Sequence, residues 1–260
     1  MTHLFTQHDK LGGALGNFLD SEFRPLLETK LDSAGWEITP YVNVFNRSPE
    51  FGFSQFLDNP RYSTGYTTLW NTLGVMLETH MLKPYKKRVE GTYEFMRSII
   101  TIVDNNETRI RELRAKSFEN QLEAKDYYFN YKIDSTRSST LNFKGFELDT
   151  LISEVTALPR IKFNRNRPYE REIIFQNYFT PSDTITIPAA YIIKKGWHAV
   201  LERLENNKIE VTELESDTTL FVESYKIESY KTYSNPYEGH YPHYETKVVS
   251  AMGTIEFSAG

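Results

Sequence analysis

The chain has 260 residues, of which 39% are hydrophobic and 14% aromatic, so it can bury a packed core and is not intrinsically disordered. Its formal net charge of -5 argues against non-specific binding to nucleic acid or to an anionic membrane surface, since both require a basic patch. The absence of cysteine excludes disulfides and thiolate ligation of zinc. No apolar run approaches the roughly 20 residues that span a bilayer.

The first 60 residues predict an amphipathic helix followed by short strands and loops. Apolar residues recur with helical spacing over residues 8–33. Pro25 is expected to kink this helix or divide it, and Gly35 to cap its carboxyl end. Residues 36–44 alternate as two short strands do, and a polar loop follows.

The most informative stretch is residues 62–88, Y-S-T-G-Y-T-T-L-W-N-T-L-G-V-M-L-E-T-H-M-L-K-P-Y-K-K-R. A turn is expected around Gly65, and residues 73–77 form an apolar run suited to a buried strand. The run ends on Glu78, and a helix is expected from about Lys86. A carboxylate at the carboxyl end of a buried strand lies at the rim where open α/β sheets bind ligands. Spacing alone leaves two interpretations open, a functional carboxylate and a solvated strand end that pairs with a nearby cation.

The order of Y-S-T-G-Y, apolar strand, glutamate, loop and R-V-x-x-T-Y helix resembles the closing part of the catalytic domain in zinc carboxypeptidases of the carboxypeptidase A family. The resemblance implies that Glu78 is the general base that activates a zinc-bound water. It also implies that Tyr66, or next Tyr62, closes over the C-terminal carboxylate of a peptide substrate. The resemblance covers roughly the first 115 residues and continues more weakly in L-N-F-K-G-F-E, I-P-A-A-Y-I-I, G-W-H and Y-E-G-H-Y-P-H.

Two arginines in the loop before this stretch are candidates for binding a substrate carboxylate. Arg47 and Arg61 both lie among polar, turn-forming residues, and a guanidinium can hold a carboxylate through two hydrogen bonds. Arg61 ranks ahead because it adjoins the tyrosine-bearing segment. A solvated surface arginine is the alternative for each.

The chemistry of the family shows what this chain lacks. Zinc lowers the pKa of its bound water towards about 7, and a carboxylate then takes the water's proton. The family holds the metal with an H-x-x-E pair and a distant histidine, but none of the six histidines here has glutamate three residues on. The resemblance therefore implies that the Zn²⁺ ligands lie upstream, that this chain is a fragment with no metal ligand, and that it is inactive alone.

The rest of the chain reads as helix and then as strands. The helical period returns over residues 86–121, with an apolar face suited to packing on the sheet and a break near Asn105. The character of the sequence changes near residue 120, after which tyrosine-rich and alternating segments predict strands. One helix is predicted near residues 188–206 with Pro188 in its first turn. Further strands are predicted at residues 209–211, 219–229 and 246–257.

A histidine pair near the carboxyl end is a weaker candidate site. His240 and His243 form an H-x-x-H pair flanked by Glu238 and Glu245, a ligand set that can bind a metal. Pro242 fixes a turn there, and spacing assures no third ligand, so a tyrosine-rich turn between strands is the alternative.

We therefore predict an α/β protein with a partial carboxypeptidase-like α/β/α sheet domain over residues 1–120. A β-rich α+β module with one helix is expected over residues 121–260. The predicted function is part of a zinc metallocarboxypeptidase-like hydrolase that removes C-terminal residues from a peptide substrate. The alternative is a non-catalytic module on a peptidase-like scaffold, which either binds peptides or glycans or has a structural role. Secretion or a periplasmic location is suggested by the resemblance only, and the oligomeric state is left open.

Overall fold

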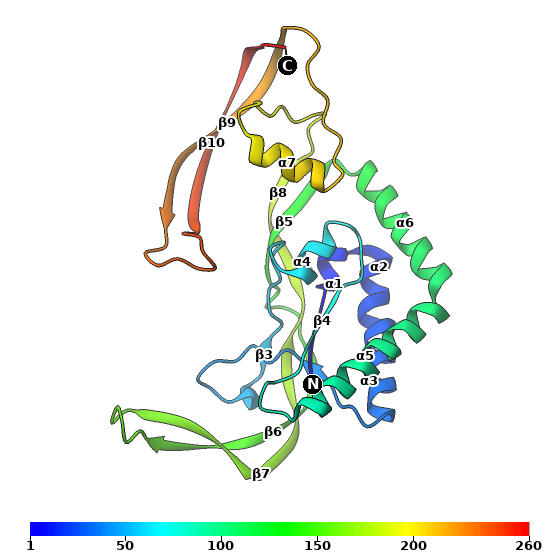
Figure 1. The fold of residues 1–260 in the computed structure, drawn as a ribbon, viewed down its shortest axis with the longest axis vertical. Coiled ribbons are helices and arrows are strands. Elements are labelled where there is room, and N and C mark those ends of the chain that lie inside the picture. Colours follow the sequence, from blue (N-terminus) through cyan, green and yellow to red (C-terminus); the bar gives the residue numbers. More distant parts are fainter. Residues whose placement is uncertain (260) are drawn as a thin grey trace. The chain divides into compact units, whose positions relative to one another are not determined.

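A computed structural model describes residues 1–259, and their contacts divide the chain into two compact units, Met1–Ile187 and Pro188–Gly260. Helices occur together with mixed and antiparallel sheets, so the general α/β class predicted from the sequence is confirmed (Figure 1). The change of character predicted near residue 120 corresponds to the end of one helix and the start of a strand, and the first unit continues past it. The assignment of residues 1–120 and 121–260 to a catalytic domain and an accessory module stays a prediction.

A three-stranded sheet lies at the centre of the first unit. Its strands are ordered β2-β1-β4, with β1 parallel to β2 and antiparallel to β4. The bounds are β1 (Thr2–Phe5), β2 (Thr39–Pro40) and β4 (Val75–Glu78). Of the two strands predicted over residues 36–44, only Thr39–Pro40 pairs in the sheet. The strand predicted over residues 73–77 is confirmed as β4, but it is half-buried at an edge instead of fully buried.

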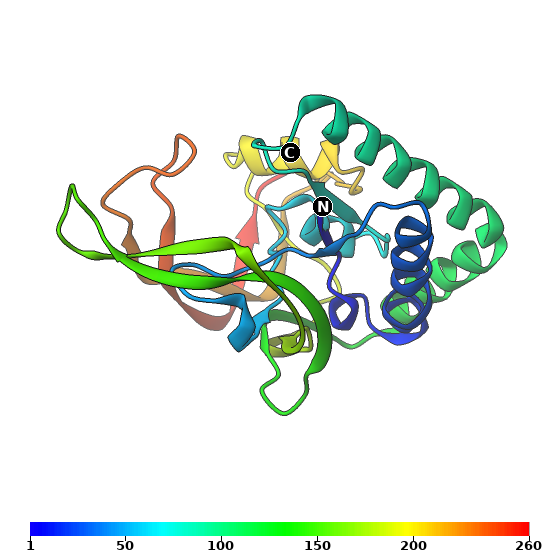
Figure 2. The ribbon, with the colours of Figure 1, turned by 90° about the horizontal axis from the view of Figure 1, so that it is seen from below.

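Helices from three parts of the chain enclose the core on this sheet. They are α1 (His8–Leu11), α2 (Gly13–Phe18), the π-helix η1 (Leu19–Phe23), α3 (Arg24–Ser33), α4 (Ser63–Thr68), α5 (Tyr85–Asn105) and α6 (Glu107–Glu123). The core combines Leu15, Phe18, Leu27 and Leu31 with Phe95 of α5, and Val75 and Leu77 of β4 pack against it. In Figures 1 and 2, α3 and α5 lie beside one another, as their contacts require.

The helix predicted over residues 8–33 forms with two interruptions. Gly12 breaks it near its start because its φ of 64° is left-handed, a conformation that glycine adopts without strain. The π-helical turn then precedes Pro25, which lies in the first turn of α3 where its missing N–H costs no hydrogen bond. Gly35 has a φ of 78° just after α3 ends, so the predicted cap is confirmed.

Helix α5 begins at Tyr85 and ends at Asn105, close to the predicted start and break. The apolar face predicted from the sequence, which includes Val89, Tyr93, Ile99 and Ile100, is buried only in part. Ile99 packs against the core, whereas Val89, Tyr93 and Ile100 are 49%, 68% and 66% exposed. The buried residues of α5 are instead Gly91, Phe95, Ser98 and Ile102, and the helix packs on α3. The helix therefore carries apolar residues on two faces, of which one is covered.

The remaining strands of the first unit form two further sheets. In the first of these, β3 pairs with β7 and β7 pairs with β6, and in the second β5 pairs with β8. The bounds are β3 (Phe53–Ser54), β5 (Asp126–Ile133), β6 (Ser139–Ile152), β7 (Pro159–Gln176) and β8 (Phe179–Thr186). Strands β6 and β7 make a long twisted hairpin (Figure 2), and a small core of Phe53, Phe143, Ile173 and Phe175 lies on this sheet. The short 3₁₀-helix η2 (Pro49–Phe51) precedes β3.

The second unit consists of one helix and one antiparallel hairpin. They are α7 (His198–Asn206), β9 (Thr218–Thr232) and β10 (His243–Phe257). The two long strands agree with the prediction, but no strand forms at residues 209–211. The predicted helix near 188–206 begins only at His198, and Pro188 lies outside it. Gly196 lies just before Trp197, the N-cap of α7. Glycine has a low helix propensity, so it disfavours extension of the helix towards Pro188.

The packing of α3 predicts that two neighbouring leucines contribute very differently to the free energy of unfolding. Leu27 is 0% exposed in the core and Leu26 is 48% exposed. We expect Leu27→Ala to lower the free energy of unfolding by about 2–5 kcal/mol, because it removes buried methyl groups and leaves a cavity. Leu26→Ala is the matched control and should change it by less than about 1 kcal/mol. Urea denaturation measures both, and equal effects would contradict the assigned core.

Candidate functional site

Glu78, the predicted general base, is the last residue of β4 and its side chain is exposed. Its backbone lies opposite Thr2 at the amino end of β1. Because β4 runs antiparallel to β1, this carboxyl end lies where the two parallel strands of the sheet begin. The expected position at the carboxyl ends of parallel strands is therefore wrong for this sheet. Glu78 remains a fixed, solvent-accessible carboxylate.

Arg61, Tyr62 and Tyr66 lie together in one segment that leads into α4. The turn expected around Gly65 is instead the middle of this short helix. Tyr62 caps it, and the amide of Tyr66 donates to the carbonyl of Tyr62 over 2.8 Å. The guanidinium carbon of Arg61 lies 5.9 Å from the centre of the Tyr62 ring. Both tyrosine rings are partly exposed, at 36% and 42%.

Aromatic packing fixes the two tyrosines differently. Tyr62 meets Phe56 edge-on at 5.0 Å between ring centres, and Phe56 in turn meets Tyr41 at 6.2 Å. Tyr66 contacts Trp70, which lies two residues beyond the end of α4, at 6.3 Å between ring centres. Such pairs are worth roughly 0.5–1.5 kcal/mol beyond their buried area. Each ring is therefore packed against another aromatic ring and remains partly exposed to solvent.

A threonine cluster ties this helix to the start of β4. The Thr6 hydroxyl lies 2.8 Å from the Thr67 hydroxyl and 3.1 Å from the carbonyl of Thr64, both in α4. The amide of Gly74 donates to the Thr6 hydroxyl over 3.0 Å, and the amide of Thr6 donates to the carbonyl of Gly74 over 2.9 Å. A side chain at Gly74 would overlap the hydroxyls of Thr6 and Thr67, so only glycine fits.

The cluster determines which candidate residues come together. Tyr62 and Tyr66 are carried by α4, which is tethered at Gly74. Glu78 lies at the other end of β4, about 13 Å of strand from Gly74 at the usual rise per residue. The structure thus joins Arg61, Tyr62 and Tyr66 in one segment and places Glu78 at the opposite end of the strand.

A buried ion pair holds the loop ahead of Arg61. The Lys10 ammonium lies 2.6 Å from the Asp58 carboxylate and also donates to the Asp58 carbonyl. Asp58 is 0% exposed, and its second carboxylate oxygen has no hydrogen-bond partner in the part of the chain that the structure describes. Gly65 packs on the carbonyls of Asp58 and Asn59 so closely that a Cβ would overlap them. The loop is therefore fixed from both sides.

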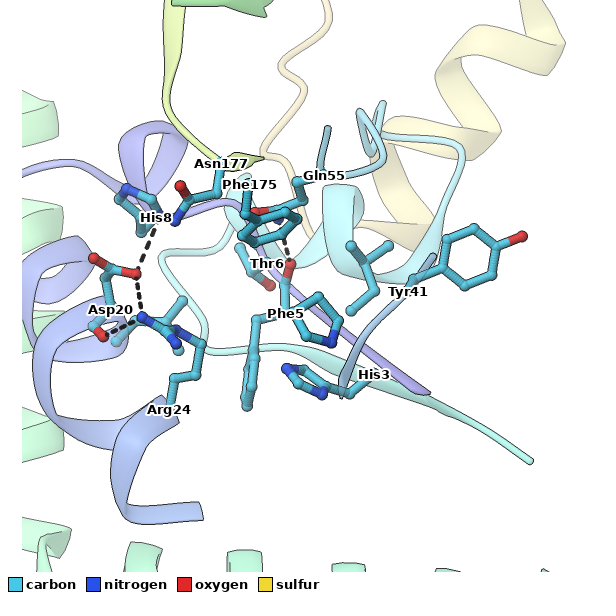
Figure 3. A pocket seen from close by; sticks show the side chains of 13 residues that line it. His3, Phe5, Thr6, His8, Asp20, Arg24, Tyr41, Gln55, Phe175 and Asn177 are labelled. Atoms are coloured by element: carbon cyan, nitrogen blue, oxygen red, sulfur yellow. Dashed lines mark hydrogen bonds and ion pairs between the residues drawn. The ribbon is translucent and has the colours of Figure 1, made fainter. Parts of the chain in front are cut away.

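The pocket in Figure 3 is lined by residues from β1, α1 and α3 and by Gln55. It has a volume of about 30 Å³, enough for a water molecule. Gln55 donates to the carbonyl of Phe5 at its edge, while Asp20 bridges Arg24 and His8. His3 is 2% exposed and its Nδ1 has no partner among the described residues. Burial, helped by the positive charge of Arg24, lowers the pKa of His3 to about 3.

Sequence reasoning missed Lys10, Asp58, Thr6 and His3, which fix the site. The side chain of Lys10 binds a residue 48 positions away in the chain, and that of Thr6 binds residues 58 to 68 positions away. No local spacing encodes such contacts.

The described residues do not form a metal site. Within residues 1–259, no group of three or more His, Asp or Glu side chains is placed so that it could hold a metal ion. At the predicted histidine pair, His243 bonds Thr232 over 2.9 Å and meets the Tyr230 ring edge-on at 4.7 Å. His240 pairs through its backbone with Tyr237 in a tight turn. The alternative of a tyrosine-rich turn between strands describes this geometry.

The Lys10–Asp58 pair predicts strong energetic coupling. We expect Asp58→Asn to lower the free energy of unfolding by about 3–5 kcal/mol, because it leaves the Lys10 charge buried without its partner. Lys10→Met combined with Asp58→Asn should cost at least about 1 kcal/mol less than the sum of the single changes. Lys116→Met, which breaks the exposed pair with Glu119, is the control and should cost under about 0.5 kcal/mol. Additive effects in urea denaturation would contradict the coupling.

The depressed pKa of His3 predicts acid sensitivity. Unfolded His3 titrates near 6.5 and folded His3 near 3, so between these values the unfolded chain binds the extra proton. The stability that neutral His3 contributes is complete above pH 6.5 and decreases by about 1.4 kcal/mol per pH unit as the pH falls towards 3. Glu28, whose pKa burial raises, opposes this trend at the acid end.

We expect His3→Phe to flatten the decrease in unfolding free energy between pH 6.5 and pH 5. The exposed His198→Phe should leave the slope unchanged. Urea denaturation at several pH values measures both slopes, and an unaltered slope in His3→Phe would overturn the assignment.

Comparisons with known proteins identify no relative. No protein-family model matches the chain, no curated protein matches it, and no solved structure matches it. Among the described residues, no helix is both long and apolar enough to cross a membrane. The function must therefore be argued from the residues themselves.

Proposed function

We propose that this chain contributes the general base and the substrate-contacting segment of a zinc carboxypeptidase-like hydrolase that removes C-terminal residues from peptides. The observation that carries the proposal is the order of elements around Glu78. This residue ends a hydrogen-bonded strand, its side chain is exposed, and a loop and then a long helix follow it. This is the order of elements in which the resemblance assigns a general base. The carboxypeptidase-like form of the sheet is part of the same proposal.

Glu78 has the properties that proton transfer requires. Its backbone is fixed by pairing with β1, while its carboxylate remains open to water. A carboxylate in this position accepts a proton from an attacking water and returns it to a leaving amine, provided that both come within hydrogen-bond reach. A fixed backbone with an accessible head group keeps the entropy cost of that approach small.

The segment from Arg61 to Tyr66 supplies the contacts for a peptide's free carboxylate. A guanidinium matches the planar geometry of a carboxylate, and a phenol hydroxyl adds a hydrogen bond. The buried Lys10–Asp58 pair and the Thr6 cluster hold the loop and helix that carry these groups. Binding energy is then not spent on ordering the segment.

Zinc does not fit the residues of this chain. The described part of the chain brings no ligand set together, and no H-x-x-E pair occurs in the sequence. In the proposed enzyme the metal is held by residues outside this chain, and we derive no step through it. The 260-residue chain by itself is accordingly expected to be inactive.

The experiment compares this chain with a form extended at its amino end by any sequence that its gene encodes upstream. We expect the extended form to bind one zinc and to shorten peptides with free C-termini, and not those with blocked ones. Glu78→Gln should lower kcat by at least about 100-fold, since it removes the proton acceptor and keeps the shape. Zinc content should be unchanged.

Glu90→Gln, an exposed change on α5, is the matched control and should retain activity. An extended form that is free of metal and inert, or an extended Glu78→Gln that is fully active, would contradict the proposal. The first of these outcomes would favour the non-catalytic alternative, a peptide- or glycan-binding or structural module.

A further inference from the structure

The outer face of α5 is an exposed apolar surface that the proposed function does not use. Its members recur at helical spacing and all are exposed, from 38% at Val103 to 74% at Tyr85. The stripe consists of Tyr85, Val89, Tyr93, Met96, Ile100 and Val103. Soluble proteins rarely leave such a continuous apolar stripe in water, and when they do it commonly marks an interface.

The free edge of β4 is a second unpartnered surface of the first unit. Among the described residues, β4 pairs only with β1. The hydrogen bond from the Thr6 amide to the Gly74 carbonyl sets the alternation along β4. Met76 and Glu78 therefore direct their backbone groups to β1, while Val75 and Leu77 direct theirs to the free edge. An unpaired edge of this kind is a template for pairing with another strand.

We propose that a second copy of this chain covers both surfaces, in a two-fold symmetric dimer. The strands β4 of the two copies pair antiparallel at their free edges, and the outer faces of the two α5 helices pack on one another. This inference does not rest on the proposed enzymatic function. It rests on the self-complementarity of the two surfaces.

The register of β4 suits a two-fold axis. With Met76 opposite Met76 of the second copy, Val75 lies opposite Leu77 in both directions, and all four outward backbone groups of each strand are bonded. Glu78 then lies opposite Gly74 of the second copy and not opposite another glutamate. The pairing thus avoids the repulsion of like charges across a sheet. It continues the sheet β2-β1-β4 without a gap.

The charges of α5 also favour an antiparallel second copy. Lys86, Lys87 and Arg88 occupy its first turns with no acidic residue in the first turn, and Asp104 lies near its end. Both ends are therefore charged against the helix dipole. When two α5 helices pack antiparallel about the centre of the stripe, Lys86 of each lies beside Asp104 of the other. The dipoles are then opposed favourably as well, and the interface is the same on both copies, as two-fold symmetry requires.

The test is sedimentation velocity of the whole chain between about 1 µM and 100 µM, a range that spans typical dimer affinities. We expect a reversible dimer. Tyr93→Glu with Ile100→Glu should weaken it at least roughly 30-fold, since buried aromatic anchors dominate interfaces. Leu122→Glu on α6, 88% exposed and off the stripe, is the control and should dimerise like the unaltered chain. Circular dichroism checks that each variant folds.

A second measurement does not depend on those variants. The chain contains no cysteine, so Met76→Cys introduces a single thiol. Strand residues directly opposite at a position without mutual hydrogen bonds are about 4.5 Å apart, a separation that a disulfide bridges. Mild oxidation should give a covalent dimer with Met76→Cys and none with Leu122→Cys. A chain that is monomeric throughout the range, a dimer that survives the stripe variants, or equal cross-linking at both positions overturns the proposal.

Discussion

The first unit depends on the polar junction at the carboxyl end of β1, where Thr6 and Gln7 are 1% and 0% exposed. Thr6 binds α4 and the start of β4 through one hydroxyl. Gln7 caps α1 with its side-chain oxygen and donates to the carbonyl of Asn177 over 2.9 Å with its nitrogen. Buried polar groups are costly unless they are hydrogen-bonded. The bonds that Thr6 makes to α4 and Gly74, and that Gln7 makes to Asn177, therefore specify how these distant segments meet β1.

The segment from Arg61 to Tyr66 is held in place by contacts that lead back to this junction. Asp58 is held by Lys10 of α1, and α1 is capped by Gln7. Arg61 and Tyr62 lie three and four residues after Asp58. The positions of these side chains therefore depend on contacts that begin at Gln7, just after β1. Burying a lysine–aspartate pair adds little to stability compared with apolar packing, but breaking it is costly. Its role here is better understood as fixing one position of the loop than as stabilising the fold.

Local patterns determined what the sequence could predict. The helix over residues 8–33, the cap at Gly35, the strand before Glu78 and the start of α5 all follow from residues close together in the chain. The direction of β4 and the partner of Asp58 do not, because each is decided by a contact with a segment far away in sequence. A turn was expected at Gly65 because glycine commonly marks turns. In α4 the glycine is instead required because the carbonyls of Asp58 and Asn59 leave no room for a Cβ. Thus the candidate residues could be predicted from the sequence, but the long-range contacts that position them could not.

Helix α5 shows why periodicity identifies a helix more reliably than it identifies what the helix contacts. Its pattern allows two apolar faces, one through Phe95 and Ile102 and one through Tyr93 and Ile100, and most of the residues expected to pack lie on the second. The fold buries the first, because small residues at Gly91 and Ser98 let α5 approach the rest of the unit closely, with Trp36 against Gly91. A helix that is apolar on opposite faces is suited to burial on both sides. The exposed face therefore follows from the same sequence pattern as the core, and its burial requires a partner surface.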